Sequence, residues 1–304
     1  SSAAGHTAII AATATAVIAS TATVSDTIIE RLESSTSSLA WRSVTACECA
    51  TMRSVPRDEE HLPGAVGGAT RVGRTVRRPT GPWTPAVHEL LAHLHAHDLP
   101  GVPEVHGTDD DGREVLSYVE GRGVPIDDEV VLDSVLVEAG TWLRRFHDTV
   151  EDFRPDGPRS WRGTGEVDLA DDQIVCHHDP GAYNWVIQSG HFVAMIDWDM
   201  AGPGKPIEDL AFLAWTGVPL YREIPVEDVA RRIGLLAEAY GEWGPFTILK
   251  AAVDRMSAAA DRIEAGIARG DAGIANLQKV GEPQRTRDRV AAFRERIPAI
   301  DAAL

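Results

Sequence analysis

Side chains with useful chemistry are concentrated in one stretch in the second half of the chain. Asp179 follows the apolar segment 174–176, and Asn184 stands five residues after it. Asp197 follows the apolar segment 192–196. We expect the residues after Asn184 to pair with segment 192–196 as a hairpin, which would place Asn184 and Asp197 side by side at facing strand ends. Two oxygen ligands with a third carboxylate a short loop away suit Mg²⁺, a hard cation that takes few protein side chains together with phosphates.

This arrangement predicts phosphoryl transfer from a nucleotide to a hydroxyl. The protein then has to hold the nucleotide, neutralise phosphate charge and orient the acceptor, without forming a covalent bond itself. We expect Asp179 to accept or orient the proton of the acceptor hydroxyl, and His177 to brace the loop. Asn184 and Asp197 would bind Mg²⁺. Asp199 is either a second metal contact or an exposed loop carboxylate.

Two simpler interpretations compete with this one. Asp179 and Asn184 taken alone are residue types that favour turns, and it is their combination with Asp197 after a strand that favours catalysis. The Cys-His-His run at 176–178 could suggest zinc. Because neighbouring strand residues point to opposite faces, three residues in a row do not easily share one ion.

The elements that must position these residues divide the chain into a mixed part and a mainly helical part. Before residue 122, periodicity and turn signals predict strands at 70–72 and 75–77, a helix from 85 to 97, and strands at 102–107 and 113–119. After it they predict a helix at 135–150, strands at 173–176, 185–187 and 192–196, and helices near 207–216, 226–241, 245–269 and 283–303. The Pro- and Gly-rich piece around 154–165 is predicted to be a loop.

The motifs in residues 174–211 resemble those of the aminoglycoside phosphotransferase family, a branch of the protein-kinase-like fold. They are H-x-D-x-x-x-x-N at His177, Asp179 and Asn184, I-D-[FW]-[DEG] at Asp197, and D-L-A starting at Asp209. The resemblance extends over roughly residues 60–300. It implies an α+β, two-lobed protein-kinase-like fold with a small β-rich N-lobe and a larger, mostly helical C-lobe. It also implies that Asp209 braces the catalytic loop from a helix.

The same resemblance assigns nucleotide contacts to the upstream segment. The strand–turn–strand over residues 62–80 would cover ATP, with backbone N–H groups near Gly64, Gly67 and Gly68 approaching phosphate oxygens. The segment 115–121 resembles the hinge between the lobes. The backbone of Ser117 and Val119 would then bond the adenine ring.

A cation on the third strand completes the implied nucleotide site. Family members place Lys or Arg there to hold the α- and β-phosphates, and Arg77 is the best match, with Arg78 second. The acidic partner of this cation should come from the following helix. Its register offers His88 or Glu89, and the sequence does not choose between them.

Composition narrows the class of partner. The net charge of the 304-residue chain is −17, which argues against a general basic surface for nucleic acid and suits a cationic acceptor such as an aminoglycoside or choline. Three cysteines do not suggest a disulfide framework and fit a reducing cytoplasm. The uncharged run near the N-terminus is too short and too rich in Ala and Thr to predict a membrane span. The sequence leaves the oligomeric state open.

The expected organisation has three parts. Residues 1–55 are rich in Ala, Ser and Thr and are predicted to be a weakly ordered N-terminal extension. Residues 56–121 would form the nucleotide-binding N-lobe, and residues 122–304 the C-lobe that carries catalysis and acceptor binding.

Three functions follow, in decreasing order of support. The first is an Mg²⁺-dependent phosphotransferase that moves the γ-phosphate of ATP or GTP to a hydroxyl of a small molecule. The second is a catalytically degenerate kinase-like protein that sequesters a ligand, as a binding or immunity protein would. The third is a protein kinase, which is disfavoured because too few residues separate Asp197 from Asp209 for a long activation segment.

Overall fold

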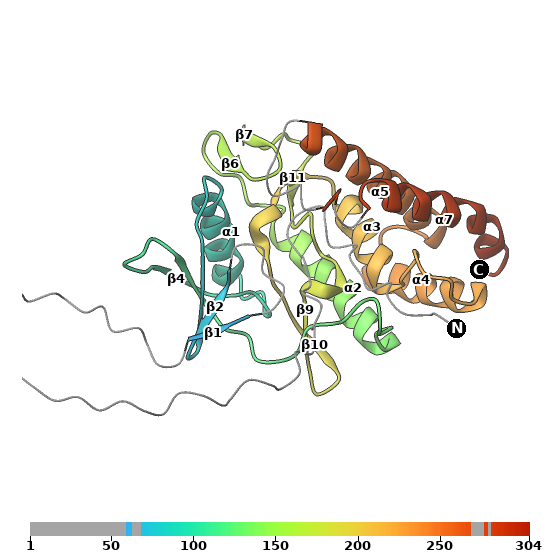
Figure 1. Cartoon of the computed structure of the whole chain (residues 1–304), viewed down its shortest axis with the longest axis horizontal. Coiled ribbons are helices and arrows are strands. Elements are labelled where there is room, and N and C mark those ends of the chain that lie inside the picture. The colour runs from blue at the N-terminus through green and yellow to red at the C-terminus, as the bar shows by residue number, and fades with distance from the viewer. Residues whose placement is uncertain (1–58, 63–67, 269–276, 279–280) are drawn as a thin grey trace, which may run out of the picture.

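The small lobe combines one antiparallel sheet with one helix (Figure 1). The computed structural model describes residues 59–62, 68–268, 277–278 and 281–304, so the expectation for residues 1–55 lies outside the described part. The five strands follow the order β1-β2-β3-β5-β4 in the sheet. Their bounds, with that of the helix, are β1 Glu59–His61, β2 Thr70–Val72, β3 Thr75–Arg78, α1 Thr84–Ala96, β4 Val105–Thr108 and β5 Glu114–Ser117.

Helix α1 forms because its sequence meets the requirements of an amphipathic helix. Pro85 stands in its first turn, where the missing N–H costs nothing. Leu90, Leu91 and Leu94 recur at helical spacing and are fully buried. They belong to one apolar core that continues from the small lobe into the large lobe.

The large lobe is mainly helical and, in the described residues, carries three short antiparallel strand pairs. Its elements are α2 Asp133–Thr149, β6 Arg159–Trp161, β7 Gly165–Val167, β8 Ile174–Cys176, η1 Ala182–Asn184, β9 Trp185–Gln188, β10 His191–Met195, η2 Trp198–Met200, β11 Gly202–Gly204, α3 Pro206–Gly217, α4 Val226–Tyr240, α5 Pro245–Ala268 and α7 Gln284–Ala302. Strand β9 pairs with β10, β8 with β11, and β6 with β7, all antiparallel. Ile187 of β9 also exchanges two backbone hydrogen bonds with Arg122, just after the small lobe.

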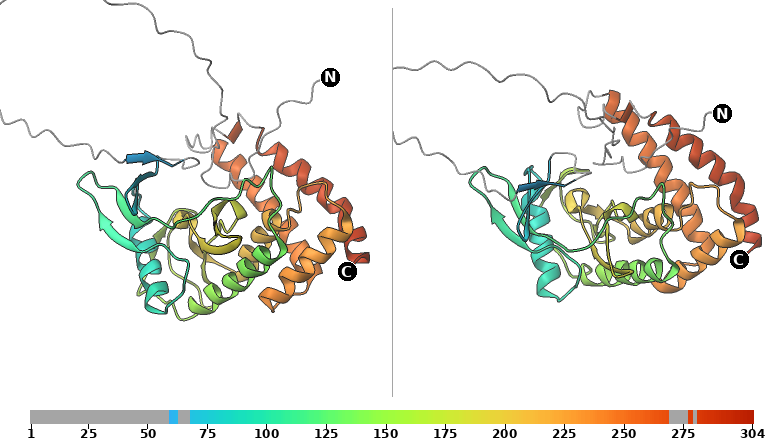
Figure 2. Two further views of the ribbon diagram at one scale, coloured as in Figure 1. Left: turned by 90° about the horizontal axis from the view of Figure 1, so that it is seen from below. Right: turned by 60° about the horizontal axis from the view of Figure 1, so that its bottom comes forward.

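Helix α3 lies at the centre of the large lobe. Its residues from Asp209 to Gly217 are all buried. Helix α3 packs against α5, and α5 packs against α7. Helices α5 and α7 run side by side at the end of the molecule far from the small lobe (Figure 2). Helix α2 packs against α4 and against β10. The segment between β8 and β9 is thereby packed against the buried helix α3.

The expected fold class is confirmed, and one expected loop is wrong. The two-lobed α+β arrangement is present, and the predicted helices and strands are found within a few residues of their expected bounds. The segment predicted as a loop around 154–165 contains β6, and its hairpin partner β7 follows. Each strand has three residues, too few for an alternating pattern to stand out, and the hairpin is fixed by the burial of Trp161. In the described residues, no helix is long and apolar enough to cross a membrane.

Candidate active site

The loop after β8 is held in place by a carboxylate from the first turn of α3. Asp209 is fully buried and accepts hydrogen bonds from the backbone N–H groups of His177 and His178, both at 2.7 Å. It also bonds His147 Nε2 of α2 at 3.1 Å. Burial opposes ionisation of Asp209, but the hydrogen bond and charge of His147 outweigh it and lower the pKa of Asp209 to about 2. Asp209 therefore ties the loop to two helices as an ionised side chain.

His177 lies inside this loop as a neutral group. It is fully buried, and its Nδ1 accepts a hydrogen bond from the backbone N–H of Asp179 at 3.3 Å. Burial lowers the pKa of His177 to about 4. Its ring stacks at a tilt on Trp198, with centroids 4.5 Å apart. These contacts are those of a residue that positions the loop, as the sequence suggested.

Asp179 is nearly inaccessible, with 1% of its surface exposed. The hydroxyl of Tyr183 donates a hydrogen bond to Oδ1, and Asn184 Nδ2 donates to Oδ2 at 3.1 Å. Burial raises the pKa of Asp179 well above its ordinary value, and the negative charge of Asp197 adds to this, while the Tyr183 and Asn184 hydrogen bonds oppose it. The carboxylate is thus a stronger base than an exposed aspartate.

Tyr183 can reach Asp179 because the loop carries a glycine beneath it. A Cβ atom built on Gly181 would lie 2.5 Å from Tyr183 Cε1, which no real contact tolerates. Gly181 itself has an ordinary extended backbone. Its role here is therefore to make room for the tyrosine ring. Sequence analysis did not single out Tyr183, because nothing in its spacing tells where its hydroxyl points.

Asn184 and Asp197 are brought together by the β9–β10 hairpin. The backbone N–H of Ile196 donates to the carbonyl of Asn184 at 3.0 Å, one residue before Asp197. Asp197 has φ of 64°, a left-handed conformation that turns the chain sharply after the strand. The sequence-based expectation of adjacent strand ends agrees with this geometry.

Asp197 and Asp199 form an acidic loop after β10. On β3, Arg78 reaches this acidic loop and Arg77 does not. The Nη2 of Arg78 lies 3.4 Å from Asp197 Oδ1 and also bonds Asp199. Arg77 bonds Thr75 and lies 3.7 Å from Asp109. Neighbouring strand residues point to opposite faces, so only one of the two arginines can face the loop. Nothing in the sequence pattern specified which one.

The carboxylate beside Arg78 comes from β5 and not from α1. Glu114 Oε1 lies 3.1 Å from Arg78 Nε, and its Oε2 bonds His88 Nε2 at 2.9 Å. Glu89, the other expected partner, instead pairs with Arg159 at 2.7 Å. His88 therefore contributes indirectly, by holding the buried Glu114.

Asp199 is an ion-paired residue, 14% exposed at its side chain. Besides Arg78, it pairs with Arg162 Nη1 at 2.9 Å. Arg162 comes from the turn of the β6–β7 hairpin, and its guanidinium lies over the ring of Trp83 at 4.6 Å. Sequence analysis missed Arg162, because it lies in the segment that was expected to be a loop.

The expected nucleotide contacts are placed only in part. Gly64 and Gly67 lie outside the described residues, while Gly68 has φ of 77° and no atom within 4 Å of a built Cβ. The Ser117 N–H donates to the carbonyl of Glu104 at 2.8 Å, so it is not available to adenine. Among the described residues, none accepts a hydrogen bond from the Val119 N–H.

Three side chains near the end of β10 and the start of β9 carry oxygen donors. Asn184, Asp197 and Asp199 offer amide and carboxylate oxygens within one loop and hairpin, which are the ligands that hard cations prefer. Burial raises the pKa of Asp197, which Arg78 opposes and Asp199 reinforces. The carboxylates of Asp197 and Asp199 lie close together and are balanced by Arg78 and Arg162, which is compatible with binding of a divalent cation.

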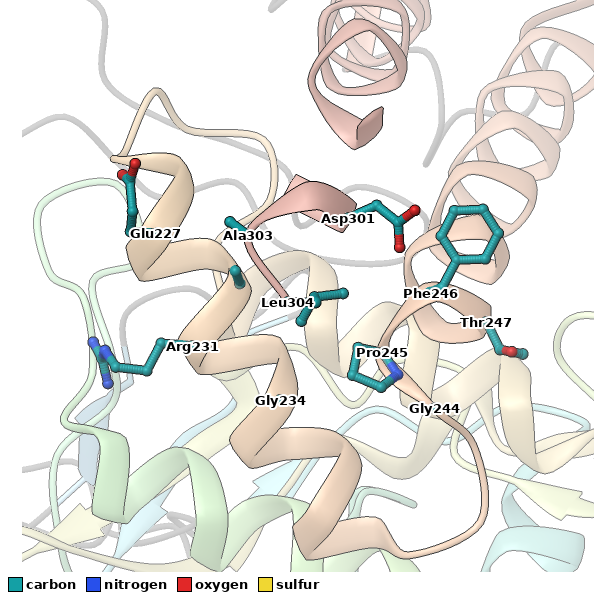
Figure 3. A pocket seen from close by; sticks show the side chains of 11 residues that line it. Glu227, Arg231, Gly234, Gly244, Pro245, Phe246, Thr247, Asp301, Ala303 and Leu304 are labelled. Atoms are coloured by element: carbon teal, nitrogen blue, oxygen red, sulfur yellow. The ribbon is translucent and has the colours of Figure 1, made fainter. Parts of the chain in front are cut away.

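A separate pocket lies away from this loop. It has a volume of about 630 Å³ and is formed where α4, the start of α5 and the end of α7 meet (Figure 3). Figure 3 shows Phe246, Leu304, Arg231 and Asp301 around it. None of its lining residues belongs to the catalytic loop or the acidic loop. It therefore does not bear on phosphoryl transfer.

Comparison with known proteins finds a family match that includes the loop of Asp179 and the hairpin before Asp197. Residues 166–246 match the family described as "Phosphotransferase enzyme family". The trifolitoxin immunity protein of Rhizobium leguminosarum bv. trifolii is 38% identical over 172 residues, which cover 55% of this chain and 62% of that protein. The chain therefore matches less than two thirds of the length of this relative.

One solved structure supports the fold. Amicoumacin kinase hAmiN, in complex with AMP-PNP, Ca²⁺ and Ami, superposes with a TM-score of 0.54 at 14% identity, over 80% of this chain and 88% of that one. The gentamicin–APH(2")-IIa complex has a TM-score of 0.48 at 13% identity, over 79% and 91% of the two chains. Residues 166–246 thus match the phosphotransferase enzyme family, and the chain has the two-lobed protein-kinase-like fold.

Proposed function

We propose that this protein transfers the γ-phosphate of ATP or GTP to a hydroxyl group of a small molecule. The observation that carries the proposal is the meeting of Asp179, Asn184 and Asp197 on one loop and one hairpin, with Arg78 reaching them from the small lobe. The family match over residues 166–246 supports a phosphotransferase of small molecules.

In the proposed reaction Asp179 is the catalytic base. The acceptor oxygen attacks the γ-phosphorus, the bond from that phosphorus to the β-bridging oxygen breaks, and the nucleoside diphosphate leaves. The hydroxyl proton passes to Asp179, whose pKa is raised mainly by burial. His177 and Asp209 act as positioning residues, since they hold the loop and not the reacting atoms.

Mg²⁺ would be held by Asn184 and Asp197, with Asp199 beside them, and would neutralise phosphate charge. Arg78 is assigned to the phosphates in place of Arg77, because it faces the acidic loop. Planar guanidinium groups bind phosphate oxygens in pairs, which suits this position.

The nucleotide contacts complete the proposal. Backbone N–H groups at Gly64, Gly67 and Gly68 would approach the phosphates, and the N–H of Val119 would bond adenine. The lobes would correspond to residues 56–121 and 122–304.

Thermal melting tests the nucleotide site directly. We expect Mg²⁺ with ATP or GTP at about 100 times Kd to stabilise the protein by roughly 2.7 kcal/mol, a Tm increase of about 5–10 °C. Asp197→Ala should abolish the increase. Asp288→Ala, an exposed change on α7, is the matched control and should retain it. The proposal is wrong if neither nucleotide shifts the Tm of the unmodified chain.

A second candidate function has its own support. The 38% identical relative is an immunity protein. In this chain the Tyr183 hydroxyl already donates a hydrogen bond to the carboxylate of Asp179, the proposed base. A catalytically degenerate protein of this fold would sequester a ligand. It would bind that ligand equally well with and without Mg²⁺ and nucleotide, whereas a phosphotransferase would release ADP or GDP when the acceptor is added.

A further inference from the structure

A buried arginine of the large lobe lies against the catalytic loop with one nitrogen unused. Arg255 belongs to α5 and is 8% exposed. Its Nη2 donates to the backbone carbonyl of His178, the residue before Asp179, at 2.8 Å. Its guanidinium lies over the ring of Phe212, 5.0 Å from the centroid. Its Nη1 is buried, and no described residue accepts a hydrogen bond from it.

The positive charge of Arg255 acts on the catalytic carboxylate. Burial dominates the raised pKa of both Asp179 and Tyr183, and Arg255 opposes it at both groups. Arg232, which is also buried, has a carboxylate partner, Asp133, at 2.5 Å. In the part of the chain that the structure describes, no carboxylate pairs with Arg255 at such a distance.

A second cation continues the same helix face. Arg262 follows Arg255 by seven residues, two turns along α5, and its side chain is exposed. Partial burial and the charge of Arg255 lower its pKa, opposed by Glu208 and Asp261. Glu208 is 43% exposed at its side chain and lies 3.7 Å from His178 Nδ1. This part of α5 therefore carries two arginines, Arg255 and Arg262, within a chain of net charge −17.

We propose that the acceptor carries a carboxylate near its reactive hydroxyl, and that Arg255 binds the carboxylate while Asp179 faces the hydroxyl. The inference rests on the proposed function and names its acceptor class. A buried guanidinium with an unpaired N–H is costly, and a carboxylate supplies two charge-assisted hydrogen bonds. The hydroxyl of Tyr183 occupies Asp179 Oδ1 in this structure, so the arriving acceptor has to replace it.

This assignment reverses the expectation from overall composition. Net charge suggested a cationic acceptor, but binding is decided by the charges that line the site. A cationic group placed beside Arg255 and Arg262 would be repelled in a region where burial weakens screening.

The test measures which charged compounds bind. The full chain is melted in Mg²⁺ and AMP-PNP with two hydroxycarboxylates, 4-hydroxybutyrate and gluconate, and with two cationic hydroxyl compounds, choline and kanamycin. We expect the hydroxycarboxylates to raise Tm and the cationic compounds to leave it unchanged. Arg255→Gln should weaken the apparent affinity for the hydroxycarboxylates about 10- to 100-fold, the loss expected for a charge-assisted pair.

Two further variants keep the test decisive. Arg262→Gln changes an exposed side chain, so it should fold normally and weaken affinity about two- to fivefold. Arg289→Gln is the matched control: Arg289 also has an unpartnered Nη1 and lies over a ring, Tyr221, at 5.0 Å, but on α7. It should change nothing.

Each outcome separates this inference from the proposed function. The inference is overturned if the cationic compounds bind and the hydroxycarboxylates do not, or if no hydroxycarboxylate binds at all. It is also overturned if Arg255→Gln and Arg289→Gln behave alike. Failure of Mg²⁺ and nucleotide alone to shift Tm would overturn the proposed function, whereas hydroxycarboxylate binding that depends on Arg255 would still support the acceptor class.

Discussion

Both carboxylate oxygens of Asp179 are hydrogen-bonded within its own loop. Tyr183 donates to one and Asn184 to the other. Burial raises the pKa of Asp179, whereas the hydrogen bond from Tyr183 favours the ionised form and opposes that shift. Tyr183 therefore adjusts the strength of the proposed base and also covers it.

Removing the Tyr183 hydroxyl should shift the pH dependence of turnover. A base must be ionised to act, so activity rises as pH increases through its pKa. Tyr183→Phe removes a donor to the ionised form and raises the pKa of Asp179 further. We expect the acidic limb of the kcat/KM profile to move to higher pH, measured as ADP release between pH 5 and 9.

Two other variants bracket this result. Asp179→Asn should lower kcat by about 10²- to 10⁴-fold, the usual contribution of a positioned base, without a pH limb. Gly181→Ala should push the Tyr183 ring aside and shift the limb in the same direction as Tyr183→Phe. An unchanged limb in both Tyr183→Phe and Gly181→Ala would show that Tyr183 does not act on Asp179.

At the scale of elements, Asp209 joins α2, α3 and the strand β8 loop. Its folded pKa of about 2 lies below the ordinary value of 3.8. Because the folded pKa is lowered, its stabilising contribution is present above about pH 4 and is lost as pH falls through about 2. A shift of this size corresponds to about 2–3 kcal/mol at neutral pH.

Asp209→Asn should therefore lower the free energy of unfolding by about 2–3 kcal/mol at pH 7, with a Tm decrease of roughly 5–10 °C. The asparagine amide would also place an N–H against a backbone donor of the loop. Urea unfolding measures the change. Glu208→Gln, one residue away and partly exposed, should stay within about 0.5 kcal/mol of the unmodified protein. Equal stability of the two variants would contradict the bracing role of Asp209.

The sequence predicted the elements better than the contacts between them. The β9–β10 hairpin follows from two apolar strands around a turn, so the approach of Asn184 to Asp197 could be predicted. The choice between Arg77 and Arg78 could not, because a one-residue slip in register exchanges the two faces of a strand. Glu114 as the partner of Arg78 depends on the pairing of β3 with β5, a long-range contact.

Side-chain directions within the catalytic loop were also beyond prediction. The spacing of Asp179 and Asn184 gave their proximity, but the position of the Tyr183 hydroxyl depends on the space that Gly181 leaves. Arg162 reaches Asp199 from strands of three residues, too short to carry a periodic signal. The site residues with motif spacing could be anticipated, and those that arrive from elsewhere in the fold could not.

At the scale of the whole molecule, the β6–β7 hairpin links the two lobes. Arg159 pairs with Glu89 of α1, and Arg162 lies between Trp83 of the small lobe and Asp199 of the large lobe. Arg162→Gln should speed amide exchange in residues 159–167 by about 5- to 30-fold, since it removes about 1–2 kcal/mol of local contacts. Exchange measured by mass spectrometry would test this.

The effect should be local. Global unfolding in urea should change by less than about 1 kcal/mol, because Arg162 is partly exposed. Arg159→Gln, which removes an exposed pair on the same hairpin, should speed exchange less than Arg162→Gln. If both variants had equal effects, the hairpin would not depend on the contact to Asp199.

The arginines of the site are surrounded by a strongly acidic molecule, and this has a kinetic consequence. A net charge of −17 creates a long-range field that repels anions before they reach Arg78, Arg162 or Arg255. A nucleoside triphosphate is therefore repelled by the net charge as it approaches. It is attracted by the arginines only within a Debye length of about 8–10 Å. Added salt screens the outer repulsion more than the buried attraction. The association rate constant of the nucleotide should therefore rise with ionic strength, the opposite of the behaviour of a basic nucleotide-binding protein.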